Sequence, residues 1–167
     1  MTAANDVVVL IGPMGVGKTT IGRKLAKALK LPFLDTDNLI TEEHGPIPAI
    51  FEERGEAEFR RLEEKAMEKA IRETAVVATG GGAILSELTR KRLRDVTVVY
   101  LSTDGKHIGS RLQHGNRPLL QNGVEDWRRI YEERKPLYKS TANFEVNTSG
   151  QPINASIKEI IEKLGKA

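Results

Sequence analysis

The 167-residue sequence contains no cysteine, a single tryptophan and only 5% aromatic residues. The lack of cysteine excludes disulfide bonds and thiolate metal sites, and it suits the reducing cytoplasm. Long apolar runs are also missing, because the run near the start, Val7–Ile11, is far shorter than the roughly 20 residues that span a bilayer. No signal-peptide pattern surrounds this run. We therefore expect a cytoplasmic protein without a membrane partner.

Neither sign of charge is in large excess, since 26 Lys and Arg stand against 23 Asp and Glu, a net charge of +3. The densest basic cluster comprises Arg90, Lys91, Arg92 and Arg94, in a helix-like segment that opens with Ser86 and Glu87. A solvated helix face explains this cluster better than a polyanion-binding patch. We expect no nucleic-acid partner, and a local basic pocket for phosphates would explain the surplus charge equally well.

Short β-rich runs alternate with longer stretches of helical period. We expect strands at Val7–Ile11, Phe33–Asp35, Ala75–Thr79, Thr97–Leu101 and Phe144–Val146. This alternation predicts βαβ crossovers and hence an α/β fold, with a parallel sheet and helices on both faces. No repeat or linker divides the chain, so we treat residues 1–167 as one domain.

Apolar residues three and four positions apart mark the helices. They recur over residues 21–29, over 59–70 and, most regularly, over 157–164. We expect helices to begin at Glu56 and at Asp104, because each follows a residue typical of a helix start.

Two stretches rich in glycine and proline, residues 36–54 and 112–124, interrupt the alternation. In an α/β sheet, such insertions lie beyond the carboxyl ends of the strands, where ligands bind. We therefore predict a substrate flap in the first stretch and a lid in the second.

Residues 12–19, Gly-Pro-Met-Gly-Val-Gly-Lys-Thr, match the pattern G-x-x-x-x-G-K-[ST] and directly follow an apolar run. The glycines let backbone N–H groups approach phosphates, and the helix that follows adds a favourable N-terminal potential. Lys18 would reach the β- and γ-phosphates, and the Thr19 hydroxyl would bind Mg²⁺. The alternative is a glycine-rich turn with an incidental lysine. Because motif and context agree, we predict a nucleotide site.

Asp35 and Asp37 close the second expected strand, at the same sheet edge as the phosphate loop. At positions i and i+2 of an extended segment, both carboxylates would point the same way. One would hold Mg²⁺ through water, and the other would orient an acceptor hydroxyl and take its proton. The alternative, in which the aspartates cap the next helix, is equally well supported by the residues alone.

Residues 80–82, three consecutive glycines, follow the apolar run 76–78. They would bring bare backbone N–H groups close to a ligand, although a flexible turn is the alternative. Arg60, Arg117 and Arg134 would complete the site, because a guanidinium group binds planar carboxylates and phosphates with two hydrogen bonds.

Taken together, these segments resemble the shikimate kinases. The matching segments, in the family's order, are the phosphate loop, Asp35-Thr-Asp37, Phe51 with Gly55-Glu56…Phe59-Arg60…Glu63, Thr79-Gly-Gly-Gly82, Arg117-Pro-Leu-Leu120 and Arg134…Pro136-Leu-Tyr138. The resemblance implies a three-layer α/β/α P-loop NTPase fold of the nucleoside-monophosphate-kinase type. This fold would have a five-stranded parallel sheet, a substrate-binding region at residues 36–63 and a lid at 112–124.

The resemblance also implies an activity, the transfer of the γ-phosphoryl group of ATP to the 3-hydroxyl of shikimate, on the route to chorismate and the aromatic amino acids. The protein would act as a monomer. Lys18, Asp37 and Arg117 would be catalytic, with Asp37 as the base and Arg117 as the lid arginine. Mg²⁺ would be served by Thr19 and, through water, by Asp35. Shikimate would contact Asp37, Arg60, Glu63, Gly80, Gly81, Gly82 and Arg134, with Arg60 and Arg134 clamping its carboxylate. ATP would contact Gly12, Met14, Gly15, Val16, Gly17, Lys18, Thr19, Thr20, Arg111, Arg117, Gln151 and Pro152, with Arg111 and Gln151-Pro152 on the adenine side.

Two other functions fit parts of the pattern. A gluconate or nucleotide kinase of the same fold would also have a phosphate loop, and two arginines would clamp a nucleotide phosphate as readily as a carboxylate. The aspartate pair and the triple glycine favour a polyhydroxylated acid instead. A catalytically inactive ATP-binding module should have lost Lys18, Asp37, Arg117 or a clamping arginine, and all of them are present.

Overall fold

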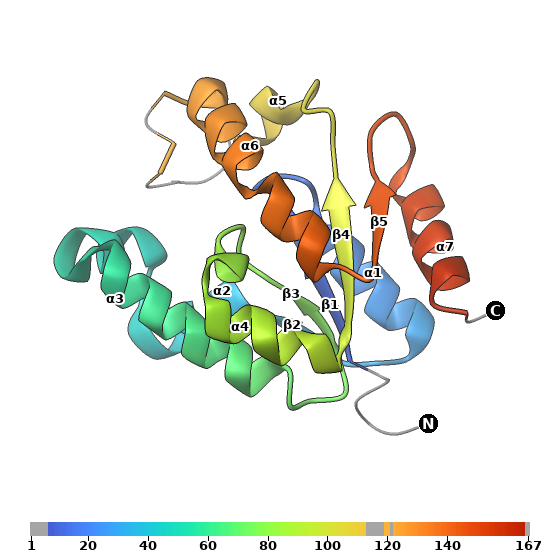
Figure 1. The fold of residues 1–167 in the computed structure, drawn as a ribbon, viewed down its shortest axis with the longest axis horizontal. Helices are drawn as coiled ribbons and strands as arrows, with labels where there is room; N and C mark the ends of the chain where they lie inside the picture. Colours follow the sequence, from blue (N-terminus) through green and yellow to red (C-terminus); the bar gives the residue numbers. More distant parts are fainter. Residues whose placement is uncertain (1–6, 113–118, 121, 166–167) are drawn as a thin grey trace.

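The structure, a computed structural model, describes residues 7–112, 119–120 and 122–165. These residues form a five-stranded sheet in the order β2 (Phe33–Asp35), β3 (Val76–Ala78), β1 (Val8–Ile11), β4 (Thr97–Ser102) and β5 (Phe144–Asn147) (Figure 1). Every neighbouring pair of strands is parallel. Each strand lies within one residue of the range predicted from the sequence, and the predicted fold class is confirmed.

Alternate residues of β1 point to opposite faces of the sheet. Val9 and Ile11 face a core that is closed by α3 (Ile47–Ala70) and α6 (Val124–Thr141). Val8 and Leu10 face a second core, closed by α1 (Lys18–Leu29) and α7 (Ile153–Lys163). Figure 1 shows α6 crossing in front of the sheet and α1 behind it. The continuous apolar run of β1 is therefore explained by burial on both faces, as is usual in parallel sheets.

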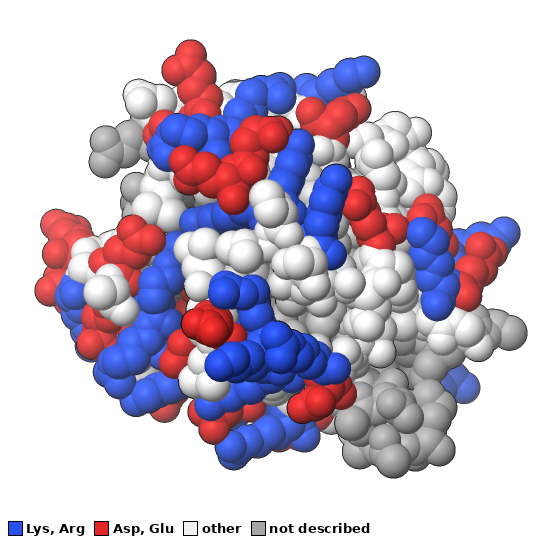
Figure 2. Space-filling model, in the orientation of Figure 1, with Lys and Arg blue, Asp and Glu red and all other residues white. Residues whose placement is uncertain are grey.

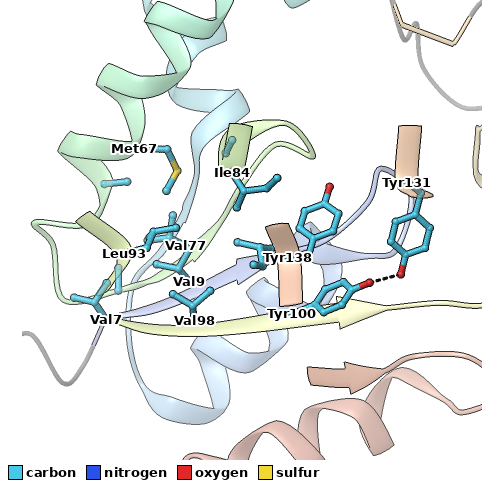
Figure 3. Close-up of a cluster of buried hydrophobic side chains, with 14 of the residues drawn as sticks. Val7, Val9, Met67, Val77, Ile84, Leu93, Val98, Tyr100, Tyr131 and Tyr138 are labelled. Carbon is cyan, nitrogen blue, oxygen red and sulfur yellow. Dashed lines mark hydrogen bonds between the residues drawn. The ribbon is translucent and has the colours of Figure 1, made fainter. Parts of the chain in front are cut away.

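One tyrosine from β4 and two from α6 pack against one another in the first core. Tyr100 of β4 stacks on Tyr138, with ring centroids 5.2 Å apart, and its hydroxyl hydrogen-bonds to that of Tyr131 (Figure 3). Burial raises the pKa of both Tyr100 and Tyr138, so their hydroxyls stay protonated. The α6 helix is thereby fixed to the sheet beside the phosphate loop.

Helices α2 (Thr36–His44) and α3 pack together in a third cluster, built around Ile40, Ile50 and Phe59. Figure 1 shows this pair beside the sheet, with one end of α3 projecting beyond it. Gly55 interrupts α3 with φ 84° and ψ 167°, so helical geometry resumes at Glu56, where a helix start was predicted. The α2–α3 pair includes most of the predicted substrate-binding region.

The helix predicted to begin at Asp104 begins instead at Ile108, where α5 (Ile108–Leu112) starts. The Asp104 carboxylate accepts a hydrogen bond from the backbone N–H of Lys106 at 2.9 Å. Asp104 therefore stabilises a turn that precedes α5, a role that the same residue type favours as strongly as a helix N-cap.

The predicted basic cluster lies on and just after α4 (Glu87–Arg92), whose N-cap is Ser86. Figure 2 shows Lys and Arg side chains gathered over this region, with acidic side chains among them. Lys91 lies 3.7 Å from Glu87, and Arg92 lies 3.5 Å from Glu68. The pairing agrees with a solvated helix face. In the described part of the chain, no helix is long and apolar enough to cross a bilayer.

Candidate active site

The phosphate loop joins β1 to α1 in the backbone conformation that its glycines permit. Gly12, Gly15 and Gly17 have φ values of 149°, 77° and 104°, which residues with a Cβ rarely adopt. A Cβ on Gly12 would lie 2.4 Å from the Leu101 carbonyl oxygen. Lys18 begins α1, is 8% exposed, and donates from Nζ to the Pro13 carbonyl at 2.8 Å. The ammonium group therefore lies along the loop and not out in solvent.

Thr19 and Asp35, the residues predicted to serve Mg²⁺, contact each other directly. The Thr19 hydroxyl donates to Asp35 Oδ2 at 2.9 Å. The other carboxylate oxygen, Oδ1, accepts from the backbone N–H groups of Asp37 and Asn38, so that Asp35 is the N-cap of α2. The sequence left a choice between a metal role and a capping role, and the structure shows the capping role.

Asp35 and Asp37 do not lie in one extended segment, and this expectation is wrong. Asp35 ends β2, whereas Asp37 lies in the first turn of α2. Both nevertheless line the same cleft, because α2 begins directly at the carboxyl edge of the sheet. They approach the phosphate loop from a strand end and from a helix start.

A cleft of about 430 Å³ runs along the phosphate loop and α1. Arg111 of α5 lines it and donates from Nη1 to the carbonyls of Gly15 and Val16 at 3.0 and 3.2 Å. Gln151 also lines it, whereas the neighbouring Pro152, the N-cap of α7, is not among the described lining residues. The lining residues predicted for ATP are Met14, Gly15, Val16, Gly17, Lys18, Thr19, Thr20, Arg111 and Gln151.

A second cavity, of about 150 Å³, lies between the triple glycine and α3. A Cβ on Gly82 would lie 2.2 Å from Arg60 Nη1, and one on Gly80 would lie 2.8 Å from Glu63 Oε2. The same Cβ on Gly80 would lie 2.9 Å from Asp37 Oδ1. Charged side chains from α2 and α3 therefore pack directly on this stretch of backbone, and a Cβ there would displace them.

Charges are concentrated around this cavity. Arg60 Nη1 pairs with Glu63 Oε1 at 2.8 Å, and Arg60 Nη2 lies 3.3 Å from Glu56 Oε2. Burial raises the pKa of Glu63, although the Arg60 guanidinium acts to lower it. Arg134 of α6 is 8% exposed, and its Nη1 would lie 3.6 Å from a Cβ on Gly81. Two arginines from different helices therefore flank the triple glycine.

The cleft and the cavity meet along a shared wall. Asp37, Met14, Gly80 and Gly81 line both. Of these four residues, only Asp37 carries a titratable side chain. A group bound in the cleft and a group bound in the cavity would meet beside this carboxylate.

Some residues at the site were given no role from the sequence, although Phe51, Phe59 and Tyr138 belong to the segments that match the family. Phe51, Phe59 and Ile47 supply the apolar side of the cavity, and Thr148 and Ser156 line the cleft. Trp127 and Tyr138 of α6 donate to the carbonyls of Met14 and Gly81, at 2.7 and 2.5 Å. The only sequence signal that could have drawn attention to Trp127 is that tryptophan occurs once in the chain. Arg117, the predicted lid arginine, lies outside the described residues.

The sheet order and the loop after β1 define a P-loop kinase of the nucleoside-monophosphate-kinase type. The chain belongs to the shikimate kinase family, whose model matches residues 14–165. It is 43% identical over 166 residues to the shikimate kinase of Rhodococcus jostii, covering 95% of this chain and 97% of that one. It is 44% identical over 162 residues to that of Mycobacterium avium, covering 93% and 92%. The resemblance drawn from the sequence is confirmed.

Solved structures agree with this assignment. A shikimate kinase from Acinetobacter baumannii in complex with shikimate matches with a TM-score of 0.91 and 37% identity, covering 97% of this chain and 94% of that one. A shikimate kinase from Bacteroides thetaiotaomicron matches with a TM-score of 0.86 and 31% identity, covering 95% and 98%. A gluconokinase from Sinorhizobium meliloti has a TM-score of 0.62 and 16% identity, covering 99% and 94%, a likeness of fold alone.

Proposed function

We propose that this protein transfers the γ-phosphoryl group of ATP to the 3-hydroxyl of shikimate, giving shikimate 3-phosphate and ADP, for chorismate and aromatic amino acid synthesis. The observation that carries the proposal is the shared wall: Asp37 lies where the phosphate-loop cleft and the arginine-flanked cavity meet. Family membership supports the same reaction.

ATP is the co-substrate, with its phosphates along the loop and Lys18 beside them. Mg²⁺ fits the residues present, because the Thr19 hydroxyl and the Asp35 carboxylate lie 2.9 Å apart at the start of α1 and both offer oxygen ligands. Among the described residues, no group of three or more His, Cys, Asp or Glu is placed to hold a metal. In this proposal Thr19 would bind the ion directly and Asp35 through water, with phosphate oxygens completing the shell. Such an ion would supply positive charge at the transferring phosphate.

Shikimate occupies the cavity with its carboxylate toward the flanking arginines, Arg60 and Arg134. Asp37 orients the 3-hydroxyl and accepts its proton as the hydroxyl oxygen bonds to the γ-phosphorus. The bond from that phosphorus to the bridging oxygen breaks, and ADP leaves. Arg117 remains the predicted lid arginine, which would stabilise the charge on the transferring group once the lid at 112–124 closes.

The test is an ADP-release assay with shikimate, gluconate and nucleoside monophosphates as acceptors. We expect turnover with shikimate only, because Arg60 in the cavity and Arg134 beside the triple glycine would bind a carboxylate, and Asp37 would bind a ring hydroxyl. Asp37→Asn should lower kcat by about 100-fold or more, with ADP affinity retained, since it removes the base but not the phosphate loop. Turnover with a nucleotide alone would refute the assignment, and so would full activity of the Asn variant. The cytoplasmic location and the monomeric state stay predictions, the second of which size-exclusion chromatography with light scattering would check.

A further inference from the structure

Trp127, the only tryptophan of the chain, connects α6 to the phosphate loop. It lies in the first turn of α6, directly after the predicted lid, and is 2% exposed. Its indole Nε1 donates to the Met14 carbonyl at 2.7 Å, across 113 positions of sequence. Its ring packs against Tyr131, with centroids 5.1 Å apart, and a Cβ on Gly105 would lie 2.8 Å from it. The donor is therefore held in one place by rigid neighbours.

The bond to Met14 belongs to a consistent pattern of carbonyl contacts in the loop. Lys18 donates to the carbonyls of Gly12 and Pro13, Trp127 to that of Met14, and Arg111 to those of Gly15 and Val16. Each of the five successive carbonyls thus accepts a side-chain hydrogen bond. In a loop that binds phosphate through its N–H groups, the orientation of each peptide plane decides whether an N–H is available.

The Met14–Gly15 peptide is trans, as are all peptide bonds in the part of the chain that the structure describes. In a planar trans peptide, the carbonyl and the N–H point in opposite directions. Because Trp127 holds the Met14 carbonyl on one side, the Gly15 N–H points to the other side. Gly15 has φ 77°, and glycine adopts many other backbone conformations as readily. The residue itself therefore does not hold the peptide plane in this orientation, and an outside contact is needed.

We propose that Trp127 is a positioning residue for phosphoryl transfer: its indole N–H fixes the Met14–Gly15 peptide so that the Gly15 N–H faces the nucleotide phosphates. The proposal rests on the proposed ATP site. In this proposal α6, the helix that follows the predicted lid, orients the phosphate loop through a direct hydrogen bond. A buried indole N–H also needs a partner for stability alone, and the experiment separates the two roles.

The chain offers a sharp test, because tryptophan occurs only once in it. A tryptophan-auxotrophic host can replace Trp127 alone with β-(3-benzothienyl)alanine, which has nearly the same shape but sulfur in place of the N–H. The matched control is 5-fluorotryptophan, which keeps the N–H. The readouts are ADP affinity by calorimetry, KM for ATP and for shikimate, kcat, and the melting temperature.

We expect the benzothienyl protein to lose about 5-fold to 10-fold in ADP affinity and in ATP KM, the scale of one net hydrogen bond. Its shikimate KM should stay close to that of the fluorotryptophan protein. Equal ADP affinity in the two proteins would overturn the proposal, as would an equal weakening for ADP and shikimate, since a general loosening of the fold would do that. Absence of turnover in the unsubstituted protein would instead contradict the proposed function. The two failures can be distinguished, because ADP affinity is measured without an acceptor and does not depend on turnover.

A second measurement needs no substitution and remains available if the benzothienyl protein does not fold. The indole N–H gives a single resonance in a ¹H–¹⁵N spectrum of the native protein. We expect ADP to shift this resonance, because phosphate binding polarises the Met14–Gly15 peptide to which the indole donates. Shikimate alone should shift it much less. A resonance that does not move at saturating ADP would refute the coupling.

Discussion

Three residues without side chains, Gly80, Gly81 and Gly82, determine how closely charged groups approach in the acceptor cavity. Asp37, Glu63 and Arg60 come from two helices, yet all lie within van der Waals reach of this short backbone stretch. A single added methyl group would displace a guanidinium or a carboxylate from it. Catalysis by positioning tolerates such displacement poorly, because a shift of about 1 Å can cost about 100-fold in rate.

Gly82→Ala should raise the KM for shikimate by about 10-fold to 100-fold, with little change in the KM for ATP. The new Cβ would fall 2.2 Å from Arg60 Nη1 and push the guanidinium out of the cavity. Steady-state kinetics with each substrate varied in turn would measure this. The control is Gly109→Ala, where the nearest heavy atom to a new Cβ, from Val124, is 3.7 Å away. A normal shikimate KM in Gly82→Ala would remove Arg60 from the carboxylate site.

Glu63 should make stability depend on pH. Burial raises its pKa in the folded protein above the ordinary value of 4.5, so the folded state binds this proton more tightly than the unfolded state. The resulting contribution to the free energy of unfolding is complete below pH 4.5 and is lost as the pH rises through the raised pKa. Relative to Glu63→Gln, the wild-type protein should therefore lose stability over this interval. Urea unfolding at a series of pH values measures the difference, with the exposed Glu53→Gln as control, and a constant difference would contradict the prediction.

At the scale of secondary-structure elements, α6 supports the site from behind, because several of its side chains contact residues that line the cleft and the cavity. Trp127 donates to the phosphate loop, Arg134 lies beside the triple glycine, and Tyr138 donates to the Gly81 carbonyl. These residues recur at spacings of seven and four, so they lie along one side of the helix. The helix that follows the predicted lid thus contacts Met14 and Gly81, which line both the cleft and the cavity.

The turn between β4 and α5 packs against α6 through Gly105, and this contact can be tested by stability. Gly105 has φ 79°, and a Cβ there would lie 2.8 Å from the buried ring of Trp127. Gly150 has φ 69° with no heavy atom within 4 Å of a new Cβ, so Gly150→Ala measures the backbone cost alone. We expect Gly105→Ala to destabilise by about 1–3 kcal/mol more than Gly150→Ala, from overpacking. Chemical denaturation measures both, and equal losses would show that the turn can move away from α6.

The sequence predicted the strands to within a residue. Three of them, β1, β3 and β4, are short apolar runs that are buried almost throughout. The sequence predicted the phosphate loop because glycine spacing and the preceding strand agree. It did not predict that Thr36 begins a helix, since Asp-Thr-Asp fits both a strand end and a capped first turn. The approach of Arg60 to Gly82 depends on how α3 packs on α2 after the interruption at Gly55, and that is tertiary information. The bond from Trp127 to Met14 joins positions 113 apart, and no local pattern encodes it.

For the molecule as a whole, the two chambers should contribute separately to thermal stability. A ligand that binds only the folded state at 100 times its Kd adds about 2.7 kcal/mol, which for a domain of this size raises Tm by about 5–10 °C. We expect such a shift from ADP and another from shikimate. In Arg60→Ala, the shikimate shift should largely disappear while the ADP shift remains, as differential scanning fluorimetry would record. Loss of both shifts would place Arg60 in the fold and not in the acceptor site.

The partition between the two chambers is thin, since it consists of the Met14 side chain, two glycines and the carboxylate of Asp37. A compound with a phosphate mimic at one end and a small carboxylic acid at the other needs only a short tether to occupy both chambers. Such a two-headed inhibitor would gain affinity from effective concentration without any new contact. Its tether would pass beside the four residues that line both chambers, and of these Met14 is the one that the proposed chemistry does not use, so resistance should first arise there.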